Sequence, residues 1–290
     1  MRNVGTETYA KLYESGVIPI LDYGNGVWGY SKKNHAELIQ NKAIRYYLGV
    51  HSFTPIPALH GEMGWLSCKY RTQLNMLRFW NRLVKMPSHR LTKHIFLTEF
   101  NSRQRYKNWS GEMRNIFQTM NLMNVYVGGT TCNLEICKSL LIKLNEDEWR
   151  SILPTKPKLR QYISFKNMYK LEPYVKNVRN KYERSLIAKL RCGILQLNVE
   201  LGRFGQIQLQ DRLCTICNLH LIEDEIHFIC SCPVYDTERA HFYNQMSNID
   251  PNFREKSTED KFISIMENSG QQLAKFIYKI WNKRNSIVYN

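Results

Sequence analysis

Four of the eight cysteines of this chain lie within residues 212–232, RLCTICNLHLIEDEIHFICSC. Two of them form a C-x2-C pair, nine residues separate that pair from a histidine, and four more precede another cysteine. Three thiolates and one imidazole fill all four positions of a tetrahedral zinc site. This is typical of a structural site, because a catalytic site keeps one position open. The spacing therefore predicts one structural Zn²⁺ ion held by Cys214, Cys217, His227 and Cys232.

Two substitutes for these ligands remain open from spacing alone. Cys230 is an alternative to Cys232, and His220 is an alternative to His227. We favour His227 because nine residues leave room for a hairpin or a loop that brings the second pair of ligands back to the first. The acidic run between the two pairs, residues 223–225, is predicted to be a solvated loop tip. The other cysteines have no histidine at ligand spacing and are predicted to be core thiols: Cys68, Cys132, Cys137 and Cys192.

The chain is strongly basic, with a formal net charge of +16 over 290 residues. Such a charge indicates a polyanionic partner, either nucleic acid or an anionic membrane surface. The charge is concentrated in two stretches. Residues 69–107 contain ten Lys or Arg against one acid, and residues 151–192 contain eleven against two. These stretches suit surfaces that follow a phosphate backbone, so RNA or DNA is the predicted partner.

The sequence contains neither a membrane span nor a signal-peptide core. No apolar run approaches the ~18 to 20 residues that a bilayer crossing needs, and the N-terminal MRNVGTETYA has no apolar core. We therefore expect an intracellular protein, nuclear or cytoplasmic, with no membrane partner. In a reducing compartment, clustered cysteines bind metal more often than they form disulfides.

Helical periodicity predicts a mainly α fold. Residues 1–152 read as a helical region, and residues 153–159 read as a linker because LPTKPK cannot continue a helix. Residues 160–249 are predicted to hold basic helices and the zinc module, and residues 250–290 a C-terminal helical tail.

Two of the predicted helices carry basic faces. In residues 64–86 the apolar face includes Trp80, which we assign to the core, and the basic residues gather away from it. In residues 180–195 the basic residues also lie away from the apolar face. The predicted nucleic-acid contacts are Arg71, Arg78, Arg82, Lys85, Lys181, Arg184 and Arg191.

Two blocks of the sequence resemble the region downstream of the polymerase domain in non-LTR (LINE-type) retrotransposon reverse transcriptases. VIPILDYGNGVWGYSKKNHAELIQNKAIRYYLGV (Val17 to Val50) is similar to the thumb segment of that family. LRCGILQLNVELGRF, the C-x2-C pair and CPVY are similar to its C-terminal zinc-binding module. The last cysteine of that module precedes proline, so the resemblance implies Cys232, which precedes Pro233, as the fourth ligand. It covers about residues 10–55 and 183–240.

The resemblance implies a helical, thumb-like region followed by a zinc-stabilised module that grips RNA or target DNA. The chain has no [YF]-x-D-D polymerase motif and no cluster of nuclease carboxylates, so we expect a non-catalytic fragment and not an enzyme. The remainder of a retrotransposon polyprotein is a further expected partner. The alternatives are a part of an RNA-directed DNA polymerase that acts only with a palm domain supplied elsewhere, and an inert transposon remnant.

Overall fold

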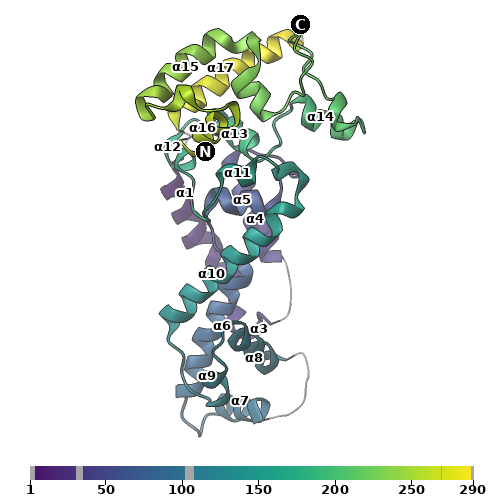
Figure 1. Cartoon of the computed structure of the whole chain (residues 1–290). Helices are drawn as coiled ribbons and strands as arrows, with labels where there is room; N and C mark the ends of the chain where they lie inside the picture. Colours follow the sequence, from purple (N-terminus) through teal and green to yellow (C-terminus); the bar gives the residue numbers. More distant parts are fainter. Residues whose placement is uncertain (1–3, 31–34, 102–107, 269, 289–290) are drawn as a thin grey trace. The chain divides into compact units, whose positions relative to one another are not determined.

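The computed structural model describes residues 4–30, 35–101, 108–268 and 270–288 (Figure 1). Within these ranges the chain forms helices and no β-strand, and one antiparallel β-bridge joins Leu213 to Ile222. The prediction of a mainly α fold that ends in C-terminal helices is confirmed. The α-helices are α1 (Thr6–Leu12), α2 (Ile18–Leu21), α3 (Asn25–Trp28), α4 (His35–Leu48), α5 (Ile56–Met63), α6 (Cys68–Lys85), α7 (Leu91–Asn101), α8 (Trp109–Thr119), α9 (Met123–Val127), α10 (Leu134–Ile152), α11 (Tyr162–Phe165), α12 (Pro173–Asn177), α13 (Lys181–Arg191), α14 (Asn198–Phe204), α15 (Asp236–Ile249), α16 (Thr258–Glu267) and α17 (Gln271–Val288).

Short helical turns connect several of these helices. Two are π-helical, η1 (Tyr13–Val17) and η5 (His227–Ser231). The 3-10 turns are η2 (Leu153–Thr155), η3 (Pro157–Leu159), η4 (Leu209–Asp211), η6 (Pro233–Tyr235) and η7 (Phe253–Glu255).

The chain divides into two compact units whose segments alternate along the sequence. Unit 1 consists of Met1–Tyr9, Asn41–Trp65 and Trp149–Asn290, and unit 2 consists of Ala10–Gln40 and Leu66–Glu148. The predicted division into consecutive segments is therefore incorrect. Helices α4 and α10 each contribute residues to both units.

The predicted linker, residues 153–159, is part of unit 1. It forms the 3-10 turns η2 and η3, each with a proline among its first residues, where a missing N–H costs no helical hydrogen bond. Leu153 and Leu159 are buried in the core of the unit. The prolines do end α10 here, but the two leucines anchor the segment in the core. The predicted tail, residues 250–290, also belongs to unit 1, where its helices supply core residues.

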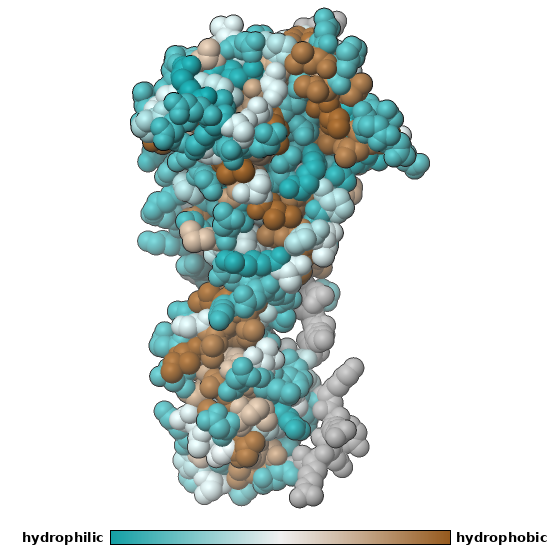
Figure 2. All heavy atoms as spheres, viewed as in Figure 1, coloured by the Kyte–Doolittle hydropathy of each residue, from teal (hydrophilic) through white to brown (hydrophobic). Residues whose placement is uncertain are grey.

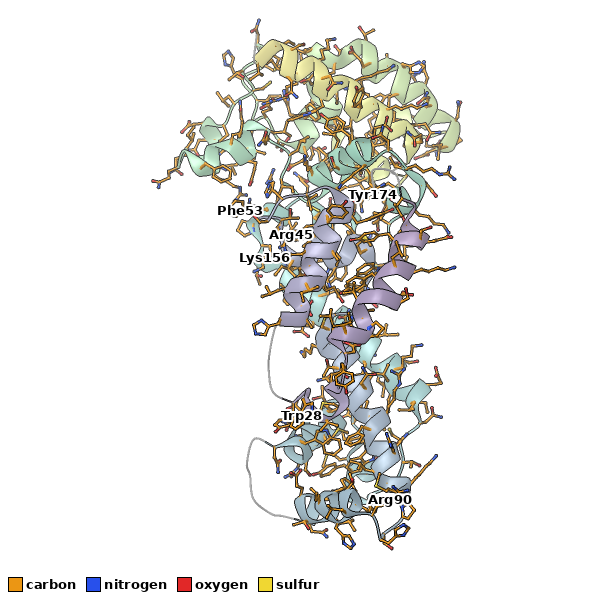
Figure 3. The ribbon with its side chains drawn as sticks, turned by 180° about the vertical axis from the view of Figure 1, so that it is seen from behind. Trp28, Arg45, Phe53, Arg90, Lys156 and Tyr174 are labelled. Carbon is orange, nitrogen blue, oxygen red and sulfur yellow. The ribbon has the colours of Figure 1, made fainter. Side chains whose placement is uncertain are left out.

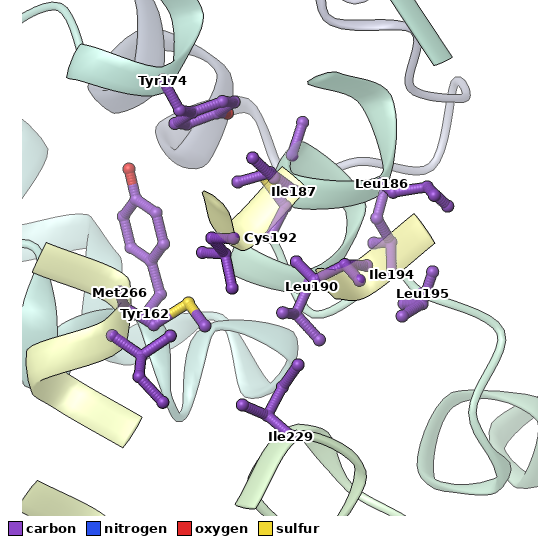
Figure 4. Packing of buried hydrophobic residues seen from close by; sticks show 14 of the residues in the cluster. Tyr162, Tyr174, Leu186, Ile187, Leu190, Cys192, Ile194, Leu195, Ile229 and Met266 are labelled. Carbon is purple, nitrogen blue, oxygen red and sulfur yellow. The ribbon is translucent and has the colours of Figure 1, made fainter. Parts of the chain in front are cut away.

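Helix α13 lies in the core of unit 1. It begins at Lys181, where the side chain of Asn180 accepts hydrogen bonds from Tyr182 N and Glu183 N. Most of its residues are buried, and Figure 4 shows Leu190 close to Ile229. The apolar face of α17 joins the same core through Leu273, Phe276, Ile277 and Ile280. Since Ile229 belongs to η5, the predicted zinc module shares this core.

The core of unit 2 forms around Trp80 on α6, which has no exposed surface. Its ring packs against Phe96 and Phe117 at centroid distances of 5.4 and 5.2 Å, and its Nε1 donates to Thr130 O at 2.9 Å. Trp80 is therefore a core residue, as its place on the apolar face predicted.

The longer helices bury one face and expose the other. On α17, for example, Lys275 and Lys279 are exposed, whereas Ile277 and Ile280 are buried. Figure 2 accordingly shows mostly hydrophilic residues on the face in view, with smaller hydrophobic patches scattered among these residues. Among the described helices, none combines the length and the apolar character that a bilayer crossing requires.

Candidate metal centre

A short hairpin carries the C-x2-C pair. The β-bridge between Leu213 and Ile222 closes it, with Cys214 N donating to Leu221 O at 2.8 Å and Glu223 N donating to Arg212 O at 3.0 Å. The intervening turn holds Cys217 and returns the chain toward His227. The hairpin encloses the C-x2-C pair, and residues 218–226 bring the chain back from it to His227.

The second ligand pair lies at the two ends of the turn η5. Asp224 Oδ1 accepts a hydrogen bond from His227 N at 2.8 Å, which satisfies a free amide at the start of the turn. Cys232 N donates to His227 O at 2.8 Å and ends the turn. This i→i+5 hydrogen bond brings the backbone of Cys232 back to that of His227, one π-helical turn away.

Four ligand atoms converge on one point. The thiols of Cys214, Cys217 and Cys232 and a ring nitrogen of His227 all lie within 4.8 Å of one another. Cys217 Sγ is 3.5 Å from His227 Nε2. In a tetrahedral zinc site, with Zn–S near 2.3 Å and Zn–N near 2.0 Å, a sulfur and a nitrogen are about 3.5 Å apart. These four side chains therefore form a group that can hold one metal ion.

Neither of the alternative ligands belongs to this group. Cys230 lies outside it, with the Tyr243 hydroxyl as its neighbour, and burial raises the pKa of its thiol to about 11. His220 is exposed, with a φ of 52° in the turn of the hairpin. The other cysteines, Cys68, Cys132, Cys137 and Cys192, are buried free thiols, as predicted.

The centre is closed to water on most sides and favours a thiolate. Cys214, His227 and Cys232 are buried, and Cys217 is half-buried. A hydrogen bond from the Cys232 thiol, assisted by His227, lowers the pKa of Cys214 to about 3 despite burial. The same hydrogen bond raises the pKa of Cys232. A deprotonated sulfur in this position is the form that binds a metal ion.

A buried ion pair fixes the base of the hairpin. Arg284 on α17 donates from Nε and Nη2 to the two carboxylate oxygens of Glu223, both at 2.7 Å. Glu223 Oε2 also accepts from Asn198 N at 2.8 Å, and Asn198 Nδ2 donates to Leu213 O at 2.7 Å. The hairpin is thereby joined to α14 and α17.

The acidic run at residues 223–225 is thus not a solvated tip, and that prediction is wrong. Glu223 and Glu225 are 1% and 2% exposed. Glu225 pairs with Arg160, although burial still raises the pKa of its carboxyl to about 7. Both carboxylates can be buried because each meets an arginine from a distant part of the chain.

Arg239 on α15 positions the other side of the centre. Its guanidinium donates from Nε to Ile229 O at 3.0 Å and from Nη2 to Cys232 O. Only 6% of the residue is exposed. It holds the carbonyls at the end of η5, and with them the backbone of the ligand Cys232.

Aromatic packing attaches η5 to the core of unit 1. The ring of Phe228 lies edge-on to Tyr235 at 5.3 Å and to Trp281 at 6.2 Å. Because Phe228 follows the ligand His227, a displacement of the centre would disturb this packing. The metal centre is therefore continuous with the core.

Only some of the predicted nucleic-acid contacts are on the surface. Arg78, Arg82 and Lys85 are exposed along α6. Lys181 is half-buried, with its ammonium 3.9 Å from the ring centroid of Tyr46. Residues 102–107, in the first basic stretch, lie outside the described part of the chain.

The other three arginines bind partners within the protein. Arg184 and Arg191 are buried, which contradicts their assignment as nucleic-acid contacts, whereas Arg71 is partly exposed. Arg71 donates to Asp22, Gln40 and the sulfur of Cys68. Arg184 is 2% exposed and donates to the carbonyls of Tyr47, Val178 and Arg179. Arg191 is also 2% exposed and forms ion pairs with Glu62 and Glu172.

Sequence reasoning missed Arg239, Arg284 and Glu223 as residues that position the centre. One signal was available for Arg284. It follows Ile277 by seven residues on α17 and therefore falls on the apolar face, where a charge predicts a buried partner. No local pattern distinguishes Arg239, whose partners are backbone carbonyls.

No family model, curated protein or solved structure matches this chain.

Proposed function

We propose that the four-residue centre holds one structural zinc ion. Three thiols and one imidazole are ligands that zinc accepts in a tetrahedron, and soft thiolates disfavour Mg²⁺ and Ca²⁺. All four positions are filled by protein side chains, so no site is left for a substrate. The ion would hold the hairpin of residues 212–223 against η5 and stabilise the core that both share.

We further propose that the chain is a non-catalytic nucleic-acid-binding protein. One observation carries this proposal: a net charge of +16 includes exposed cations that have no carboxylate partner among the described residues. Arg82 and Lys85 on α6 are examples. A polyanion would neutralise them and release its own counterions, which favours binding at low salt.

The resemblance to the thumb and zinc-binding regions of LINE-type reverse transcriptases supports the same proposal. It would make the chain a fragment that positions RNA or target DNA for a polymerase located elsewhere in the element. If so, the rest of the element's polyprotein is a second partner.

The test is the dependence of nucleic-acid affinity on salt. Fluorescence anisotropy with labelled RNA and DNA is expected to show binding that weakens by about 10³-fold or more between ~50 and ~200 mM salt, as for a protein that contacts several phosphates. The nucleotide sequence of the probe is expected to have little effect on the affinity. An affinity that hardly changes over this range would contradict the proposal.

A further inference from the structure

The segment that follows α4 runs along one face of α13 in unit 1. At Gly49 the chain turns with a φ of 69°, and a Cβ atom there would lie 2.7 Å from Ser185 Cβ. Residues 181, 185 and 189 share a helix face because they are spaced by four. Lys181 and Lys189 therefore flank the segment that contains His51 and Phe53.

Several cationic side chains lie close enough to His51 to affect its imidazole. Burial, followed by the charges of Lys158, Lys189 and Arg45, lowers the pKa of its imidazole, and the Glu200 carboxylate acts in the opposite direction. Three cations within electrostatic reach of one imidazole make this a positive part of the surface.

Two of these cations have no counter-charge. Glu200, the nearby carboxylate, already pairs with Lys158 and Arg203. Arg45 donates to Thr54 O at 3.4 Å, and its buried Nε has no hydrogen-bond partner. Lys189 has no side-chain partner among the described residues, and burial lowers its pKa. Partly buried cations without a counter-charge are unfavourable, so an anion at this position would stabilise them.

Two aromatic side chains of residues 45–53 are exposed. Phe53 is 70% exposed, and its ring lies edge-on to His51 with centroids 5.8 Å apart. Tyr46, beneath Lys181, is 52% exposed. In Figure 3 the side chains of Arg45 and Phe53 lie close together on unit 1. A large exposed ring leaves apolar surface in contact with water and offers a flat face on which a base can stack.

We propose that this surface, Arg45, Tyr46, His51, Phe53 and Lys189, binds single-stranded nucleic acid. Arg45 and Lys189 contact the phosphodiester backbone, and Phe53 stacks on an unpaired base. The inference rests on the proposed nucleic-acid-binding function and specifies its site and strand form. Single strands are selected because a paired, stacked base has no free face for Phe53.

The experiment measures anisotropy with labelled oligothymidylate and oligouridylate of about 20 nucleotides and with a duplex of the same length. Wild type is compared with Phe53→Ala, Phe53→Trp, Lys189→Glu and the milder Lys189→Gln. Lys275→Glu changes the charge equally at an exposed site on α17, and Tyr23→Ala removes an aromatic ring that is 89% exposed. Thermal melts verify that each variant is folded.

We expect Phe53→Ala to weaken single-strand binding about tenfold, with Phe53→Trp near wild type and duplex binding unchanged. Both Lys189 variants should weaken binding, and the two controls should not. Preference for either oligonucleotide fits the proposal and identifies DNA or RNA as the ligand.

The failures of the two proposals are distinguishable. If wild type binds single strands and the Phe53 and Lys189 variants bind them equally well, this surface is not the site, although the chain still binds nucleic acid. If wild type binds phosphatidylserine vesicles and neither strand form, both proposals are wrong and the partner is a membrane surface. Binding to neither probe also overturns both.

Discussion

Replacing Cys217 with serine is expected to unfold the metal-centre region of unit 1. Structural zinc sites contribute ~10–16 kcal/mol of binding free energy that becomes folding free energy, comparable to or larger than the whole stability of a typical domain. Hydrogen exchange followed by mass spectrometry should show lost protection in residues 212–235. Residues 68–85, in unit 2, should exchange as in wild type and serve as an internal reference.

Cys230, two residues before the proposed ligand Cys232, provides a matched control for Cys217→Ser. Cys230→Ser makes the same chemical change at a thiol outside the four-residue group, so we expect the metal-centre region to stay protected. A zinc chelator added to wild type should reproduce the effect of Cys217→Ser. If Cys217→Ser exchanged like wild type, the proposed role of the ion in folding would be wrong.

Replacing Arg191 with methionine is expected to cost about 3–5 kcal/mol of unfolding free energy. Arg191 Nε and Nη2 bind the two oxygens of Glu62 at 2.8 and 3.1 Å, and Nη1 donates to Met266 O at 2.6 Å. Nη2 also contacts Glu172 at 2.8 Å, a carboxylate that Lys166 shares. Without the guanidinium, the Glu62 carboxyl would lose its ion-pair partner in a site with no exposed surface. Urea unfolding, monitored by far-UV circular dichroism, measures the loss.

The same substitution at Arg82, which is exposed on α6, should change stability by less than ~0.5 kcal/mol. Adding Glu62→Gln to Arg191→Met should recover part of the loss, since the unpaired charge is then removed. Equal stability of Arg191→Met and wild type would contradict the ion-pair network.

Local spacing was sufficient to predict which four side chains form the group that can hold a metal ion. C-x2-C, the nine-residue interval and the final cysteine are all close in sequence, and the structure brings together the four residues that were named. Spacing alone did not decide between Cys230 and Cys232, because a turn that begins at His227 can bring either thiol to the site. Helical periodicity likewise predicted that Trp80 belongs to a core.

Buried charge could not be predicted in the same way. Arg184 and Arg191 fall off the apolar stripe of α13, and a helix with one apolar face would expose them. They are buried because α13 is covered on almost every side. Arg191 pairs with Glu62, which is distant in sequence, and with Glu172, which precedes the helix. The acidic run was misread for the same reason, since Arg160 and Arg284 supply its counter-charges.

The most direct measurement is the zinc content of the purified chain by native mass spectrometry. We expect one zinc ion per chain in wild type, Cys230→Ser and His220→Ala, and none in Cys217→Ser and His227→Ala. Wild type that is folded without zinc, or zinc retained after either ligand is replaced, would contradict a metal centre formed by Cys214, Cys217, His227 and Cys232.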